Sequence, residues 1–158
     1  FIGDVVAAFS NLRLGLSSAG RILLIVWRAP EQNEWYQFPV RCAKAFSDQQ
    51  AEHDPDAPGA FTLADPSKVE HILVSAGFRN IRLRAVTEEL CVGLTVKSAA
   101  DMFMAMGTIR NLLDSADIEL LEKVKHHMIQ GLEAYRHESG VYMNGTCWLV
   151  YALSLIHI

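Results

Sequence analysis

The sequence predicts an α/β fold, and three observations support this class. Residues 22–27 form a continuous apolar run, which is typical of a strand buried on both faces, as in a parallel sheet. Residues 147–153 form a second run of the same kind, and residues 80–86 alternate as a half-exposed strand near a sheet edge does. Segments with helical spacing separate these strands, and strands that alternate with helices define the α/β class.

The first predicted helix precedes residues 22–27. Asp4 can cap its N-terminus, and Val5, Phe9 and Leu12 recur at helical spacing on one face. A second helix is predicted from Trp35, with Pro39 tolerable only near its start.

Three further helices are predicted downstream. One begins at Asp65-Pro66, with Asp65 as cap and Pro66 in the first position, and ends at Gly77. Another follows a capping-box pattern that starts at Ser98. The longest spans about residues 117–135. Asn144-Gly145 then predicts a turn before the last strand.

Composition limits the possible functions. The chain has 158 residues, 51% of them hydrophobic, which suits a single domain, and its net charge of −4 gives nucleic-acid binding no support. No apolar run approaches the roughly 18–20 residues that cross a bilayer. Three widely spaced cysteines, Cys42, Cys91 and Cys147, fit reduced, buried thiols, so a cytoplasmic location is expected.

A series of short motifs occurs in a characteristic order. The motifs are Leu16-Ser17-Ser18-Ala19-Gly20, Asn33-Glu34-Trp35, Gly59-Ala60-Phe61, Asp65-Pro66, Ala76-Gly77-Phe78 and Trp148-Leu149-Val150. Together they resemble the C-terminal part of class I S-adenosylmethionine-dependent methyltransferases, in the subgroup related to ubiquinone and menaquinone biosynthesis. The resemblance covers residues 1–153, and the tail, residues 154–158, departs from it and is expected to be non-native.

The resemblance implies part of a Rossmann-like sheet, mixed because its last strand is antiparallel. That strand, residues 147–153, would pair with residues 22–27 on one side and with residues 80–86 on the other. It also implies a parent enzyme that uses S-adenosylmethionine to methylate a small-molecule acceptor. The glycine-rich turn and the ribose-binding acid of that family are missing, because the ten glycines are scattered without a G-x-G. We therefore expect this chain to hold the substrate side and no cofactor site.

Trp27, Arg28 and Trp35 are the predicted substrate-binding residues. Trp27 and Arg28 leave the carboxyl end of a strand predicted to be parallel, which is where ligands bind in open α/β sheets. The alternative is that both tryptophans pack in the core and Arg28 is solvated. No catalytic side chain is predicted, since a methyl sulfonium is already activated and needs mainly alignment.

Two other clusters have a functional and a structural interpretation. The apolar group Met102, Phe103, Met104 and Met106 could cover a substrate or be ordinary helix core. His53, Asp54 and Asp56 lie in a loop without a known metal-ligand spacing, so no metal is predicted. The alternative function for the whole chain is a non-catalytic, methyltransferase-like domain that binds an apolar ligand or a protein partner.

Overall fold

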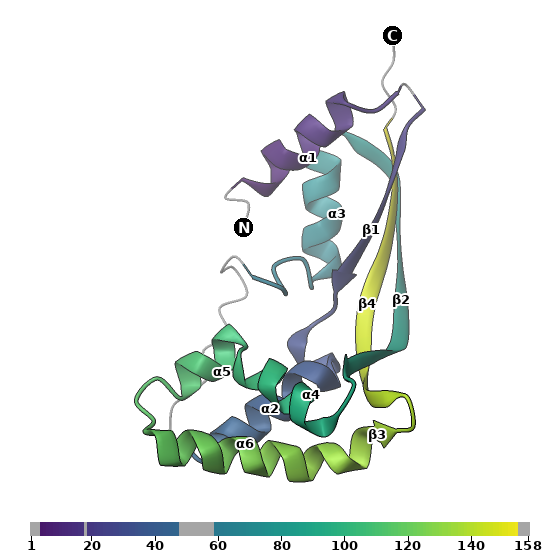
Figure 1. The fold of residues 1–158 in the computed structure, drawn as a ribbon. Helices are drawn as coiled ribbons and strands as arrows, with labels where there is room; N and C mark the ends of the chain where they lie inside the picture. Colours follow the sequence, from purple (N-terminus) through teal and green to yellow (C-terminus); the bar gives the residue numbers. More distant parts are fainter. Residues whose placement is uncertain (1–3, 18, 48–58, 155–158) are drawn as a thin grey trace. The chain divides into compact units, whose positions relative to one another are not determined.

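The computed structural model describes residues 4–17, 19–47 and 59–154 (Figure 1). Within these residues the chain forms six α-helices and an open, four-stranded antiparallel sheet, which confirms the α/β class. The chain divides into two compact units. The first unit comprises Phe1–Gln32, Asp54–Thr87 and Thr146–Ile158, and the second comprises Asn33–His53 and Glu88–Gly145.

The helices and strands follow one another in a mixed order. The helices are α1 (Val5–Leu14), α2 (Glu34–Lys44), α3 (Pro66–Ser75), α4 (Val96–Met104), α5 (Gly107–Leu112) and α6 (Ile118–Leu132), with two short 3-10 helices, η1 (Pro30–Gln32) and η2 (Glu133–Tyr135). The strands are β1 (Arg21–Trp27), β2 (Phe78–Gly93), β3 (Arg136–His137) and β4 (Gly140–Ser154). None of the helices in the described residues is both long and apolar enough to span a bilayer.

The sheet has the order β1-β4-β2, and β3 pairs with β4. Strand β4 runs antiparallel to β1, with Leu24 opposite Val150 and Trp27 opposite Cys147. The last strand therefore lies between the other two long strands, as the resemblance implied. Strand β2 is longer than predicted, since it extends to Gly93.

Helices α1 and α3 cover one face of the sheet in the first unit (Figure 1). Their core residues Phe9 and Leu73 pack with Phe78 and Val150 from the strands. Both helices begin with the predicted caps, since the Asp4 carboxylate accepts from the Ala7 N–H at 2.9 Å and that of Asp65 accepts from the Ser67 N–H at 2.8 Å. Leu12, predicted to lie on the buried face, is 56% exposed.

Strand β1 is not buried on both faces, contrary to the prediction. Ile22, Leu24 and Val26 pack against the core on the helix side, whereas Leu23 and Ile25 are 64% and 72% exposed. The described helices of the first unit, α1 and α3, lie on one side of the sheet, so alternate residues of the apolar run face solvent on the other. We call the side opposite α1 and α3 the outer face.

The second unit is built on a helical core. Phe38 of α2, Phe103 of α4 and Val124, Met128 and Leu132 of α6 are buried together. The predicted long helix divides into α6, capped by the Asp117 side chain, and η2.

Two helix starts in the second unit differ from the prediction. Helix α2 begins at Glu34, so Pro39 lies inside the helix rather than in its first turn. Helix α4 begins three residues earlier than expected, because Thr95 rather than Ser98 is its N-cap. Ser98 is the third residue of the helix and closes a capping box with Thr95. Its side chain accepts from the Thr95 N–H, and the Thr95 side chain accepts from the Ser98 N–H.

The predicted turn at Asn144-Gly145 does not form, because both residues lie within β4. The chain reverses instead at Glu138-Ser139, between β3 and β4, where His137 pairs with Gly140. A two-residue connection is the commonest way to join paired antiparallel strands. Gly140 has a φ of +146°, a conformation that glycine tolerates best.

Candidate functional site

The carboxyl end of β1 in the first unit carries two of the three predicted site residues. Trp27 is the last residue of the strand, and the Arg28 N–H that follows it donates to the Thr146 carbonyl of β4 at 3.0 Å. The strand pairing thus continues one residue past β1 and holds the backbone of Arg28 against the sheet. The Thr146 hydroxyl in turn donates to the carbonyl of Gln32 in η1 at 3.1 Å.

The Arg28 side chain stacks on an aromatic ring. Its guanidinium carbon lies 4.5 Å from the centre of the Trp148 ring, and the Trp148 indole N–H donates to the Ala64 carbonyl at 2.9 Å. Such a cation–π contact contributes about 0.5–2 kcal/mol and favours this position of the guanidinium over the ring. We call Arg28, Trp148, Ala64 and Thr146 the Arg28 cluster. Its chemistry is that of a positive charge beside an aromatic plane.

Trp27 and Arg28 lie on different sides of the sheet. Trp148 packs with the core under α1 and α3, so Arg28 stacks on the helix side. Val26 also points to that side, and the alternation of the strand therefore places Trp27 on the outer face with Leu23 and Ile25.

Trp35, the third predicted residue, belongs to α2 in the second unit. Its indole N–H donates to the Asn33 side-chain carbonyl at 3.1 Å, and its ring meets that of Tyr36 edge-on at 5.9 Å. Asn33 is fully buried, and Trp35 itself packs against the helical core. The three predicted residues therefore divide between the two units, and a shared substrate pocket stays a prediction.

The methionine-rich segment is mostly helix core. Phe103 is completely buried, and Met104 and Met106 pack against the core of the second unit. Met102 alone among the four is exposed, at 41%. The arrangement agrees with the structural interpretation of this segment.

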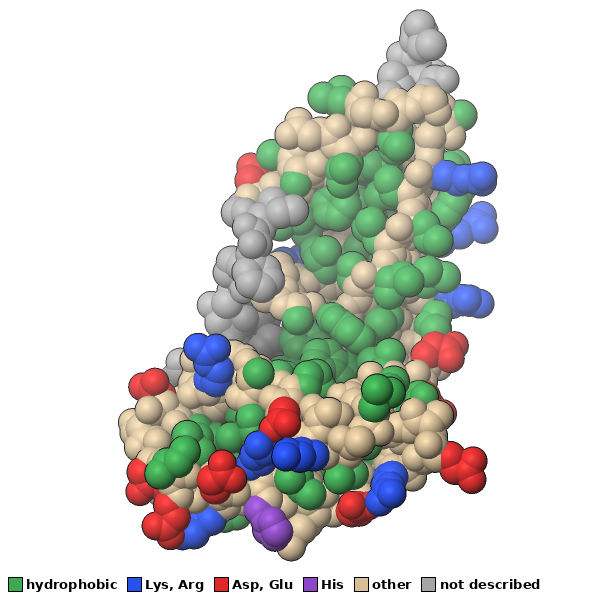
Figure 2. Space-filling view, viewed as in Figure 1, with side chains coloured by type: hydrophobic (Ala, Val, Ile, Leu, Met, Phe, Trp, Pro, Cys, Tyr) green, Lys and Arg blue, Asp and Glu red, His purple; other side chains and the backbone are tan. Residues whose placement is uncertain are grey.

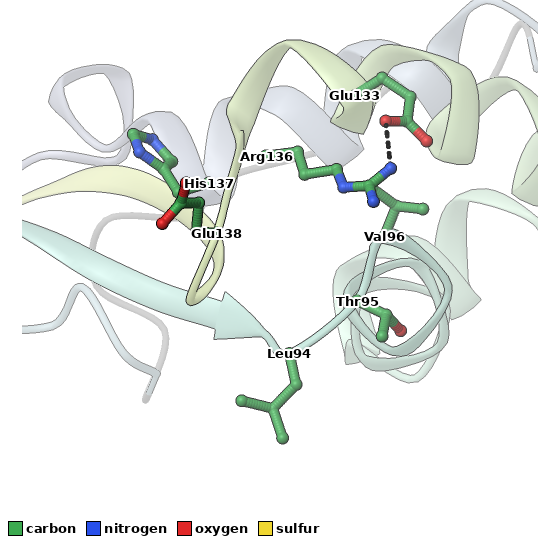
Figure 3. A pocket seen from close by; sticks show the side chains of 7 residues that line it. All are labelled: Leu94, Thr95, Val96, Glu133, Arg136, His137 and Glu138. Carbon is green, nitrogen blue, oxygen red and sulfur yellow. Dashed lines mark hydrogen bonds and ion pairs between the residues drawn. The ribbon is translucent and has the colours of Figure 1, made fainter.

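A polar pocket of about 770 Å³ lies in the second unit (Figure 3). It is bounded by the start of α4 and by η2, β3 and the turn after β3. The lining residues are Leu94, Thr95, Val96, Glu133, Arg136, His137 and Glu138. No sequence pattern predicted this pocket, because its walls come from segments that are about 40 positions apart.

One ion pair lies among the charged side chains of this pocket. The Arg136 guanidinium lies 3.3 Å from the Glu133 carboxylate, and Figure 3 shows it directed to that partner above Val96. The ring of His137 meets Tyr142 edge-on at 5.5 Å. With two carboxylates and one guanidinium among its walls, the pocket offers no excess of positive charge for an anionic ligand.

The cysteines show no nucleophilic arrangement. Burial raises the pKa of the Cys42 thiol, and the neighbouring Arg41 lowers it by less. Burial likewise raises the pKa of Cys147, so both thiols stay protonated at neutral pH. Cys91 is exposed rather than buried as predicted, since it lies in the solvent-facing part of β2.

No three His, Cys, Asp or Glu side chains of the described residues are grouped so that they could share a metal ion. His53, Asp54 and Asp56 lie outside the described residues.

No protein-family model matches the sequence, and no curated protein is significantly similar to it.

Proposed function

We infer that this chain supplies the acceptor-substrate side of a class I S-adenosylmethionine-dependent methyltransferase. The observation that carries the proposal is the order β1-β4-β2, in which the last strand is inserted antiparallel between two earlier strands. The resemblance of the sequence to these methyltransferases implies the same strand order. An open sheet assembled in sequence order would have placed β2, rather than β4, beside β1.

Within this proposal the Arg28 cluster forms part of the acceptor site. The cluster lies at the carboxyl end of β1. The Arg28 guanidinium lies over the Trp148 ring, and that ring is held by its hydrogen bond to the Ala64 carbonyl. An aromatic plane beside a guanidinium suits a planar acceptor with a polar or anionic substituent. Alignment of that acceptor with the methyl group is the contribution asked of the protein.

The test is methyl transfer by the protein expressed with its upstream coding sequence. We expect tritium from labelled S-adenosylmethionine to enter a small-molecule acceptor. Substitution of Arg28→Met should raise the KM for the acceptor by about tenfold and leave the KM for the cofactor unchanged. The substitution removes contacts to the acceptor, in both its bound state and its transition state, and removes none to the cofactor. Equal increases in the KM values of both ligands would indicate that the Arg28 cluster only packs and does not bind the acceptor.

A second measurement addresses the cofactor. The chain of residues 1–158 has no glycine-rich turn, so isothermal titration with S-adenosylmethionine should give no saturable heat. A micromolar dissociation constant in this titration would show that the cofactor site lies within these residues.

The alternative function, a non-catalytic binding domain, is favoured by one observation. Leu23 and Ile25 expose large apolar side chains side by side on the outer face. Upstream coding sequence without a strand and glycine-rich turn would favour this alternative. A cytoplasmic location forms part of both proposals, and the absence of disulfides among Cys42, Cys91 and Cys147 supports it.

A further inference from the structure

The outer face of the first unit combines apolar and basic side chains. In the pairing of β1 with β4, Leu23 lies opposite Tyr151 and Ile25 lies opposite Leu149. These four side chains form one apolar patch, because directly opposed residues of antiparallel strands share a face. Leu23 and Ile25 are among the most exposed large apolar side chains of the described residues.

Arginines flank this patch. Ile81 and Leu83 of β2 pack on the helix side, so Arg82 and Arg84 alternate onto the outer face. Arg21 lies at the beginning of β1, in the same register as Leu23 and Ile25. Figure 2 shows basic side chains along the margin where Figure 1 places β2, at the right of both views.

The charge of this face is unusual for the chain. The net charge is −4, yet the strand residues of the first unit (Arg21–Trp27, 78–87 and 146–154) include no Asp or Glu. Neither Arg82 nor Arg84 forms an ion pair with any residue that the structure describes. The face is therefore complementary to a surface that is both apolar and acidic.

We propose that the outer face docks an acidic amphipathic α-helix, with its apolar stripe on Leu23, Ile25, Leu149 and Tyr151 and its carboxylates beside Arg82 and Arg84. The geometry suits a helix that runs along the strands. Every second strand residue repeats at about 6.7 Å, close to the rise of about 6 Å over four helix residues. The same sheet already packs α1 and α3 on its other side through side chains of the same kind, Ile22, Leu24 and Val26.

A helix fits this face better than a lipid surface. Leu149 and Tyr151 are only partly exposed, so only Leu23 and Ile25 of the patch offer large exposed apolar side chains for insertion into a membrane. Its arginines lie mainly along β2, which matches a helix with acids on one flank. This inference does not depend on methyl transfer, and its test can fail while the proposed function stands.

The probe is a synthetic helical peptide of about 18 residues, with leucine at helical i, i+3, i+4 and i+7 spacing and glutamate along one flank. The matched peptide carries lysine in place of glutamate. Isothermal titration of the 158-residue chain should give saturable binding of the glutamate peptide and at least about tenfold weaker binding of the lysine peptide. Added salt should weaken the first interaction.

Charge reversal provides the decisive variant. R82E/R84E should lose affinity for the glutamate peptide by at least about tenfold and gain affinity for the lysine peptide. L23Q/I25Q should bind neither. The control K97E/R110E carries the same change in net charge at two exposed positions of the second unit and should bind as the unsubstituted chain does. Circular dichroism should show unchanged folding in all three variants, because every substituted side chain is exposed.

Three outcomes would overturn the proposal. Absence of saturable binding of the glutamate peptide excludes the helix. Sedimentation with phosphatidylglycerol vesicles that R82E/R84E abolishes, without peptide binding, assigns the face to an anionic lipid surface instead. A dimer in light scattering that L23Q/I25Q dissociates, again without peptide binding, assigns the face to a second copy of the chain.

Discussion

Tyr135 donates a hydrogen bond to the Glu34 carboxylate with an oxygen–oxygen distance of 2.6 Å, across 101 positions of the sequence. The same carboxylate oxygen lies 2.7 Å from the Arg41 guanidinium. Tyr135 also packs edge-on against Phe38, at 5.5 Å between ring centres. One side chain at the start of α2 thereby joins that helix to the end of the α6–η2 segment, and the joined elements enclose the core of the second unit.

Removal of the Tyr135 hydroxyl should destabilise the protein. Tyr135→Phe keeps the ring against Phe38 and deletes one hydrogen bond to a charged group, which typically contributes about 1.5–3 kcal/mol. We expect a loss of about that size in urea unfolding followed by circular dichroism. Tyr142→Phe is the matched control, because its hydroxyl accepts a hydrogen bond from the exposed Ser139 side chain and contacts no charged partner among the described residues, and it should change stability by under about 0.5 kcal/mol. Equal losses in the two variants would contradict the role assigned to Glu34.

The same carboxylate should make stability depend on pH. Burial tends to raise the pKa of Glu34, but the hydrogen bonds from Arg41 and Tyr135 outweigh it and leave the pKa below its usual value. A lowered folded-state pKa gives stability that is present above the unfolded pKa of about 4.3 and is lost as pH falls through the folded value. Unfolding curves between about pH 6 and pH 3 should show a smaller loss for Glu34→Gln than for the unsubstituted chain. Parallel curves would mean that Glu34 has an ordinary pKa.

Two neighbours on α4 should differ widely in their contribution to stability. Phe103→Ala empties a fully buried position and should cost about 3–5 kcal/mol. Met102→Ala removes a side chain that is 41% exposed and should cost under about 1 kcal/mol. Chemical denaturation of both variants gives the comparison. A large loss for Met102→Ala would indicate that it contacts apolar surface beyond the present core.

Gly77 and Gly107 form a second matched pair. Gly77 has a φ of +90°, and an added Cβ would lie 2.7 Å from the Arg13 Nε, which donates to the Ala76 carbonyl at 2.8 Å. Gly77→Ala should therefore destabilise the protein by about 1–3 kcal/mol. Gly107 is the first residue of α5, and an added Cβ there would meet no other atom within 4 Å. Gly107→Ala should therefore be neutral or stabilising by up to about 1 kcal/mol. Thermal unfolding measures both, and a neutral Gly77→Ala would show that the α3–β2 connection can adopt another backbone conformation.

Local sequence signals predicted several elements correctly. Asp4 and Asp65 cap their helices, and Gly77 follows α3 with a positive φ. These features depend on contacts within three or four residues, which a short stretch of sequence contains in full. The insertion of β4 between β1 and β2 was expected only from the family resemblance, since no local pattern specifies which strands pair.

Other features depend on residues far apart in the chain. Asn144-Gly145 has the composition of a turn, but its place in β4 follows from the pairing of that strand. The hydrogen bond between Glu34 and Tyr135 has no signature in either segment. The stacking of Arg28 on Trp148 likewise requires that β4 and the residues after β1 lie together.

The sequence by itself determined that residues 22–27 are a strand, because a run of large apolar residues rich in Ile and Val packs well in an extended conformation, and β1 adds only Arg21 to it. Only the tertiary structure decided which of these residues are buried. Helices α1 and α3 cover the side of Ile22, Leu24 and Val26, and no described element of the first unit covers Leu23 and Ile25. The sequence of a uniformly apolar strand does not indicate which of its faces is buried, because burial depends on helices that pack against it from elsewhere in the chain.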